Sequence, residues 1–370
     1  MKKIFIIGAF GYTNNQLDGQ TIKTRNVFDL IKAKHDGIVS YIDTLDVRRK
    51  PWILFPMLWK MVTCNKLVLI PCTNNLNVLF PIAYYMSRLF GFDIIHICIG
   101  GWQVEYFIGS KLLKIPDNYK SYGQRLTNKN KPRWTPHPLQ MKLNKRIKVI
   151  MPEMKTEIKE LENLGFSNLD FFPNFRMVNP TLKNASPNNS DVLKLIFMAR
   201  IMKLKGYETV FTFAEFAKEQ GMKVQIDFYG QINPDEESYF MSLVKSHSDN
   251  VNYCGYLVPD KITSTLMEYD MMMLPTRFYT ESLPGTILDS YIAGIPIIAT
   301  KWKYAEEFIE DGKTGFIVPF KDGQDEFNKK LKTIYEDRDK LTAMKENAAK
   351  EAIKYSEDTA WNRLKKYLYD

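Results

Sequence analysis

Short, uninterrupted apolar runs recur along the chain, and longer segments with helical periodicity separate them. Strands with continuous rather than alternating hydrophobicity are covered on both faces, which is typical of parallel sheets in α/β proteins. The pattern therefore predicts an α/β protein with a parallel sheet in each half of the chain. We expect strands at residues 4–7, 66–70, 93–97, 147–151, 195–198, 225–229, 271–274, 295–299 and 315–318.

The length of 370 residues favours two domains over a single hydrophobic core. Residues 178–191 are rich in Asn, Pro and Ser, a composition typical of a linker. The terminal segment is helical in pattern and carries apolar residues on one side, which suits docking onto the other domain. We predict an N-terminal domain over residues 1–178, a linker over 179–192, a C-terminal domain over 193–355 and a terminal helix over 356–370.

The two halves of the chain differ in net charge, and this difference limits the classes of molecule that the protein is expected to bind. Residues 1–192 hold 27 Lys and Arg against 14 Asp and Glu, a net +13, whereas residues 193–370 hold 24 against 28, a net −4. A basic half indicates an acidic partner. No helix-turn-helix, zinc-finger or RNP-like signature accompanies the charge. We therefore favour a phosphorylated acceptor or anionic lipid head groups over nucleic acid.

Cysteine usage and the start of the chain indicate the cytoplasm. The cysteines have no metal-ligand spacing and lie mostly in or beside apolar runs, as expected of buried free thiols in a reducing compartment: Cys64, Cys72, Cys98 and Cys254. The first residues read as a strand that runs into a glycine turn rather than as a signal peptide. No apolar stretch reaches the ~18 residues of a membrane span.

Residues 276–296 carry the strongest chemical signal. Glu281 and Asp289 stand slightly more than two helical turns apart, on either side of a Ser-Leu-Pro-Gly turn that opens a helix. The first turn of a helix presents unpaired N–H groups and the positive end of the dipole, which favour phosphate. A carboxylate on each side of a phosphate seat suits a sugar nucleotide, whose hydroxyls flank its diphosphate.

Two cations follow the first strand of the C-terminal domain. Arg200 leaves the strand end, where ligands bind in open α/β sheets, and Lys205 lies beside the next helix start. Together they can neutralise a diphosphate and the charge that grows on it as a bond to the sugar breaks. Taken alone they would be a solvated surface pair, but the 276–296 segment favours the binding role.

Three further segments have both a chemical and a structural interpretation. Gly8, Gly11 and Gly19 follow the first strand, where a glycine loop allows close approach to a ligand or simply forms a turn. His96 lies in a strand pattern before Gly100-Gly101 and is either a core histidine, which we favour, or a catalytic base. Residues 48–60 mix cations with Trp, Phe and Leu, which suits a membrane interface or a core helix behind a charged loop.

These motifs together resemble the retaining glycosyltransferases of family 4. The resemblance is carried by Arg200 with Lys205-Gly206, Tyr229-Gly230, the turn at 253–256, Glu281 with Asp289, the runs at 293–296 and 311–315, and residues 172–175. It covers residues 195–320 well and the N-terminal half more loosely. It implies the GT-B fold, in which two Rossmann-like, doubly wound parallel-sheet domains face each other across a cleft and a C-terminal helix packs back on the first.

The resemblance also implies roles for individual residues. Glu281 would bond a donor-sugar hydroxyl and Asp289 the ribose, while Arg200 and Lys205 would neutralise the diphosphate. The remaining donor-side candidates are Gly19, Gly230, Ser282, Leu283, Pro284 and Gly285, and the acceptor-side candidates are Gly11, His96, Gly100 and Gly101. The chain departs from the family pattern in having Asp at 289 rather than Glu, and Gly100-Gly101 where the family often has a histidine.

We therefore expect a sugar-nucleotide-dependent glycosyltransferase that retains anomeric configuration and needs neither a metal nor a cofactor. A polyprenyl-diphosphate-linked saccharide of capsule or exopolysaccharide assembly is the expected acceptor, met at the cytoplasmic face of the membrane. The alternatives are a sugar-nucleotide epimerase of similar fold and a binding protein without turnover.

Overall fold

The structure is a computed structural model that describes residues 2–13, 16, 18–47, 50–70, 73–101, 103–109, 127–128, 131–132, 137–178 and 190–370. The predicted linker therefore falls largely outside the described residues, as do Arg48 and Arg49 of the 48–60 segment. The chain forms two compact units. The first comprises the described residues up to 178 together with Tyr355–Asp370, and the second comprises residues 190–354.

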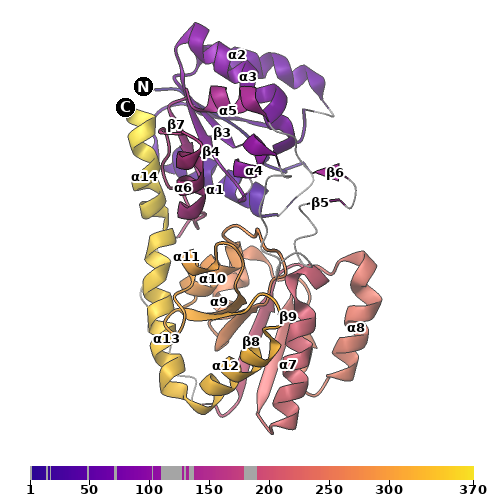
Figure 1. The fold of residues 1–370 in the computed structure, drawn as a ribbon. Helices are drawn as coiled ribbons and strands as arrows, with labels where there is room; N and C mark the ends of the chain where they lie inside the picture. The colour runs from indigo at the N-terminus through magenta and orange to yellow at the C-terminus, as the bar shows by residue number, and fades with distance from the viewer. Residues whose placement is uncertain are drawn as a thin grey trace. The chain divides into compact units, whose positions relative to one another are not determined.

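The first unit is built on a five-stranded parallel sheet with the order β2-β1-β3-β4-β7 (Figure 1). Its strands are β1 (Ile4–Gly8), β2 (Val39–Asp43), β3 (Lys66–Ile70), β4 (Asp93–Ile97) and β7 (Val149–Met151). Its helices are α1 (Gly19–Lys34), α2 (Leu54–Thr63), α3 (Thr73–Phe90), α4 (Gln103–Ile108), α5 (Pro138–Asn144) and α6 (Lys155–Asn163). A short antiparallel pair, β5 (Thr127–Asn128) and β6 (Lys131–Pro132), accompanies them.

Both faces of this sheet are covered, which explains the continuous apolar runs. Ile4 and Ile6 of β1 belong to a buried cluster with residues of α1. Phe5 and Ile7, which alternate with them, belong to a second cluster with residues of α2 and α3. Successive strand residues point to opposite faces, so a strand buried on both must be apolar throughout.

The C-terminal helix α14 (Glu357–Tyr369) packs against α1 in this first unit, as predicted. Ser356 begins the helix by accepting a hydrogen bond from the Thr359 N–H. Leu364 and Leu368 are fully buried in the cluster that α1 shares with the sheet. The end of the chain is thus part of the core of the unit formed by its beginning.

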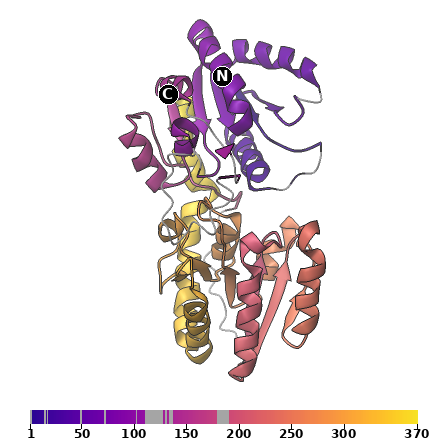
Figure 2. The same cartoon turned by 45° about the vertical axis from the view of Figure 1, so that its right-hand side comes forward.

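The second unit, which Figure 2 draws from another side, contains a six-stranded parallel sheet. Its strand order is β10-β9-β8-β11-β12-β13. Its strands are β8 (Leu193–Met198), β9 (Val224–Tyr229), β10 (Val251–Tyr253), β11 (Met271–Leu274), β12 (Ile297–Thr300) and β13 (Gly315–Val318). Its helices are α7 (Tyr207–Glu219), α8 (Glu237–Ser246), α9 (Ile262–Leu266), α10 (Gly285–Ile292), α11 (Ala305–Phe308), α12 (Gln324–Glu336) and α13 (Arg338–Glu351).

All nine predicted strands are present, with ends shifted by up to two residues. Among the described residues, sequence reasoning missed the short antiparallel pair β5–β6 and two strands at the edges of the parallel sheets, β2 and β10. Edge strands are partly exposed and carry polar residues, so their apolar signal is weak: Tyr41 of β2 and Asn252 of β10 are exposed. In the described part of the chain, no helix is both long enough and apolar enough to cross a membrane.

Leu364 tests whether α14 stabilises the first unit. We expect Leu364→Ala to lower the free energy of unfolding by about 2–5 kcal/mol, because it removes a fully buried side chain and leaves a cavity. The neighbouring, exposed Lys365→Ala is the control and should change stability by less than about 0.5 kcal/mol. Equal effects of the two changes in urea unfolding would contradict this role for α14.

Candidate functional site

Arg200 and Gly230 lie side by side after the neighbouring strands β8 and β9. The strands continue their pairing here, since the Ala199 N–H donates to the Tyr229 carbonyl over 3.1 Å. Gly230 has a φ of 142°, and a Cβ there would lie only 1.9 Å from the Ala199 carbonyl oxygen. Only glycine therefore fits beside this backbone. Arg200 follows Ala199 and is exposed to solvent beyond the carboxyl end of β8.

Lys205 and Glu281 are 76 positions apart in sequence and form an ion pair in the structure. The Lys205 Nζ lies 2.5 Å from Glu281 Oε2, and each side chain is 18% exposed. Lys205 ends a single 3-10 turn, Lys203–Lys205, whereas Glu281 lies in the loop before α10. The fold thus joins two of the residues that the sequence singled out, one cation and one carboxylate.

Thr276 also bonds the Glu281 carboxylate, and Thr300 in turn holds Thr276. The Thr276 hydroxyl donates to Glu281 Oε2 over 3.3 Å, and the Thr300 hydroxyl donates to the Thr276 carbonyl over 2.5 Å. Both threonines are buried; Thr276 follows the end of β11, and Thr300 is the last residue of β12. Sequence reasoning missed them. Their only signal was a hydroxyl residue at a strand end, which does not reveal the partner.

The loop that carries Lys205 is fixed against the strand end that leads to Glu281. The Arg277 N–H donates to the Leu204 carbonyl over 2.8 Å. Gly206 has a φ of 81°, and a Cβ there would lie 1.8 Å from the Pro275 carbonyl oxygen. This close approach sets the distance between the two loops, and with it the position of Lys205 relative to Glu281.

The start of α10 is placed as an anion site requires. The helix begins at Gly285, after Pro284 in extended conformation, and no described side chain caps it. Ser282, Pro284 and Gly285 are partly exposed, whereas Leu283 is buried. The first N–H groups of the helix are therefore available to a ligand. Asp289 lies one turn inside the helix, and only 8% of it is exposed. Its contact with the ribose of a donor stays a prediction.

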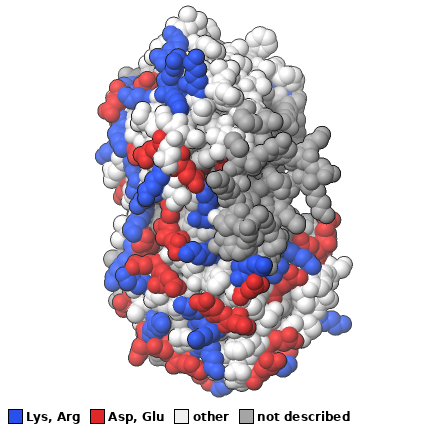
Figure 3. Space-filling view, viewed as in Figure 1, with Lys and Arg blue, Asp and Glu red and all other residues white. Residues whose placement is uncertain are grey.

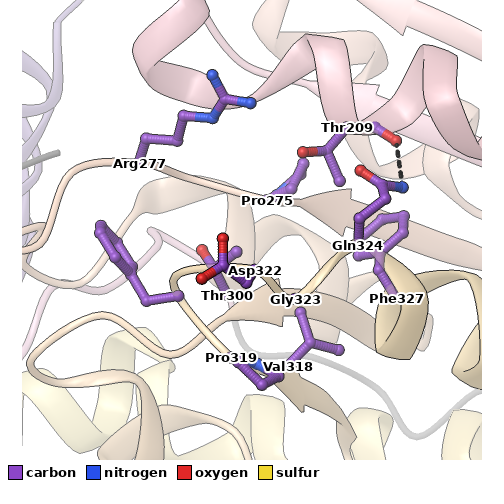
Figure 4. Close-up of a pocket in the computed structure, with 11 residues that line it drawn as sticks. Thr209, Pro275, Arg277, Thr300, Val318, Pro319, Asp322, Gly323, Gln324 and Phe327 are labelled. Carbon is purple, nitrogen blue, oxygen red and sulfur yellow. Dashed lines mark hydrogen bonds between the residues drawn. The ribbon is translucent and has the colours of Figure 1, made fainter. Parts of the chain in front are cut away.

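A cavity of about 210 Å³ opens beside this network (Figure 4). It lies at the carboxyl ends of β11, β12 and β13, and Pro275, Arg277 and Thr300 line it. Arg277 contributes a guanidinium held by Glu208 at 3.0 Å. The cavity wall thus shares residues with the support of the Lys205–Glu281 pair. The carboxyl ends of these strands thus form a hollow next to the candidate site.

In the first unit, the glycine loop after β1 is bound internally by Asp43. The Asp43 carboxylate accepts from the Phe10 N–H at 3.0 Å and the Gly11 N–H at 2.7 Å. The N–H of Gly11 is therefore committed to a carboxylate. Gly19, in contrast, is exposed at the start of α1, which Asp18 caps by accepting from the Thr21 N–H.

A buried ion pair positions the Gly100-Gly101 turn. Lys23 of α1 lies 2.7 Å from Glu153, and the two side chains are 0% and 2% exposed. The second oxygen of Glu153 accepts from the Gly100 N–H over 3.0 Å. Sequence reasoning missed both residues. The signal for Lys23 was its position one helical turn before Val27, which places both residues on the buried side of α1.

His96 is a core residue of the first unit, as its structural interpretation supposed, and it does not reach a surface ligand. Asn144 Nδ2 donates to a backbone carbonyl, so the amide oxygen accepts from His96 Nδ1–H over 3.0 Å. Burial lowers the pKa of His96 to about 4. The imidazole is therefore neutral at pH 7 and stabilises the packing around β4.

Comparison with known proteins adds to this geometry. Residues 178–351 match the family Glycosyl transferases group 1. The putative colanic acid biosynthesis glycosyltransferase WcaL of Salmonella typhimurium is 26% identical over 138 residues, which are 36% of this chain and 34% of WcaL. The N,N'-diacetylbacillosaminyl-diphospho-undecaprenol alpha-1,3-N-acetylgalactosaminyltransferase of Campylobacter jejuni is 25% identical over 219 residues, 58% of this chain and 55% of that protein.

The chain spans between about a third and about half of the length of these curated relatives. Among solved structures, HepE of Anabaena in complex with UDP and glucose superposes over 100% of this chain and 99% of its own, with a TM-score of 0.68 and 15% identity. The fold is GT-B. The lipopolysaccharide outer core galactosyltransferase WaaB covers the same shares with a TM-score of 0.64 and 12% identity. The family match and the named relatives support a glycosyltransferase.

Gly206 tests whether close loop packing fixes the Lys205–Glu281 site of this GT-B chain. We expect Gly206→Ala to cost ~3 kcal/mol or more of stability, because the new Cβ meets the Pro275 carbonyl in addition to the strain of a positive φ. Gly255→Ala is the matched control. It has a φ of 80° with open space around it and should cost about 1 kcal/mol. Similar losses in thermal unfolding would show that the approach to Pro275 is unimportant.

His96 makes stability depend on pH. The unfolded imidazole takes up a proton below about 6.5, whereas the folded one does so only near 4. The lowered pKa of His96 therefore contributes fully to the free energy of unfolding above pH 6.5. This contribution, about 3 kcal/mol at most, is lost on acidification toward pH 4. We expect His96→Gln to flatten the fall of the melting temperature over this range. The control Lys365→Ala, which removes an exposed group that does not titrate between pH 4 and 6.5, should leave the profile unchanged.

Proposed function

We propose that the chain is a retaining glycosyltransferase that moves a sugar from a nucleoside-diphosphate donor, with UDP as the nucleotide, to a hydroxyl of a saccharide acceptor. The observation that carries this proposal is the Lys205–Glu281 pair beside the open start of α10. The two side chains together are neutral, and Arg200 adds one exposed positive charge at the neighbouring strand end. A diphosphate gains from that charge and from the helix N–H groups.

The same groups suit the chemistry of transfer. The bond between the anomeric carbon and the diphosphate oxygen breaks while the bond to the acceptor oxygen forms on the same face of the sugar. The acceptor proton passes to the departing diphosphate. Lys205, Arg200 and the α10 amides stabilise the negative charge that develops there, the role that a metal ion has in other transferases. Glu281, held by Thr276, accepts from a hydroxyl of the donor sugar.

The acceptor side of the proposal rests on the first unit. We infer that the acceptor is a polyprenyl-diphosphate-linked saccharide of capsule or exopolysaccharide assembly, met at the cytoplasmic face of the membrane. The excess of positive charge in residues 1–192 supports a phosphorylated acceptor. The Gly100-Gly101 turn, tied to the buried Glu153, offers a fixed backbone after β4 for its recognition.

The experiment is a thermal-shift screen of nucleotide sugars, followed by an assay of nucleoside diphosphate release with a lipid-diphosphate saccharide. We expect one donor class to stabilise the protein, and release to require the acceptor. Conversion of the nucleotide sugar without any acceptor would instead identify an epimerase. Stabilisation without release under any acceptor would identify a binding protein.

Lys205→Met and Glu281→Gln should each lower kcat/KM by about 10²–10³, because each removes charge or orientation at the leaving diphosphate or the sugar. Lys218→Met is the matched control. Lys218 also pairs with a carboxylate at 2.5 Å, that of Asp249, but lies on the exposed surface of α7. It should leave kcat/KM unchanged. Full activity of Glu281→Gln would remove the basis of the proposed site.

A further inference from the structure

Helix α2 exposes large apolar side chains on one side and buries the other. Met57 and Met61 are fully buried in the core of the first unit. Phe55 and Trp59, one turn apart, are 78% and 70% exposed. Trp52, just before the helix, is exposed as well. The two interpretations of residues 48–60 thus each describe one side of the same helix.

Helix α3, which packs against α2, shows the same division. Val78, Ile82, Tyr85 and Leu89 are all exposed, and their spacing of four, three and four places them on one stripe of the helix. Val78 and Leu89 are 70% and 76% exposed. Tyr85 makes an edge contact with the Tyr84 ring, but most of the surface of Val78 and Leu89 is left uncovered by the described residues. We call the exposed apolar residues of 52–59 and of this stripe the α2–α3 face.

The segment that carries the α2–α3 face holds charge of one sign in its sequence. From Val47 to Phe92 the sequence holds six Lys and Arg and no Asp or Glu. Lys66 alone of these cations is buried among the described residues, in an ion pair with Asp93. Lys50 is exposed just before α2, whereas Lys60 is half-buried, with its Nζ 3.4 Å from the Tyr41 carbonyl oxygen. Figure 3 shows mostly uncharged surface at this end of the first unit, with Lys and Arg atoms grouped beside it.

We propose that the α2–α3 face docks on an anionic lipid bilayer, with Phe55, Trp59, Val78 and Leu89 inserted at the head-group boundary and the neighbouring cations on lipid phosphates. A segment that combines aromatic and aliphatic side chains with Lys and Arg, and holds no Asp or Glu from Val47 to Phe92, matches both the apolar and the anionic layers of such a surface. A second copy of this face would bring like charges together instead. Docking is independent of turnover, whereas its use in meeting a lipid-linked acceptor rests on the proposed function.

The test is flotation of the full chain with vesicles of phosphatidylcholine, with and without about a third phosphatidylglycerol. We expect binding to the anionic vesicles and a fall at high salt, because the lipid charge is screened. Phe55→Ser with Trp59→Ser, or Val78→Ser with Leu89→Ser, should each lower the partition coefficient about tenfold or more. Tyr239→Ser with Met241→Ser, two exposed apolar residues of α8, is the matched control and should bind as the unchanged protein.

The Ser variants should keep the melting temperature and the rate with a water-soluble saccharide acceptor, since the residues changed are exposed and lie outside the candidate site. Failure of the unchanged protein to float with anionic vesicles would overturn the proposal. So would equal flotation of the Ser variants, or a concentration-dependent dimer that those variants abolish. Flotation in the absence of any transferase activity would retain the docking surface and reject only the proposed function.

Discussion

The candidate site depends on one close backbone contact, that of Gly206 with the Pro275 carbonyl. It brings the loop after β8 against the end of β11 at a distance that no side chain permits. Lys205 and Glu281 meet only because their two loops meet there. The contact lies at the carboxyl ends of neighbouring parallel strands, where ligands bind in open α/β sheets. The packing of the sheet therefore also positions the residues of the candidate site. The constraint is local, but the residues that it joins are distant in sequence.

The parallel architecture could be predicted because burial on both faces leaves a strong mark in sequence. Strands β1 and β3 carry unbroken apolar runs, residues 4–7 and 67–70, since their alternate residues enter different cores. The edge strands β2 and β10 could not be predicted in the same way, because they are partly exposed and polar residues interrupt their apolar runs, whereas the edge strands β7 and β13 are mostly buried. Strand ends were placed only to within two residues, as at Val149 in β7.

The candidate site was predictable where chemistry is local and not where it is long-range. The order of Glu281, Ser282–Gly285 and Asp289 is a local signature. Thr276 and Thr300 support it through contacts that no spacing reveals. Residues 48–60 show a related limit. Periodicity identifies the apolar positions of a helix such as α2, but it does not say whether the core of the protein or another molecule covers them.

Two ion pairs near the candidate sites, Lys23–Glu153 and Lys205–Glu281, differ in a way that fits their positions. Lys23–Glu153 is almost fully buried and its carboxylate also binds a backbone N–H, so separating the charges would leave both desolvated. Such a pair holds one geometry. Lys205–Glu281 is partly exposed, and solvent lowers the cost of rearranging it. A partly exposed pair can exchange its mutual contact for contacts with a diphosphate and a hydroxyl. The more buried pair is therefore suited to positioning a turn, and the more exposed pair to binding a ligand that must later leave.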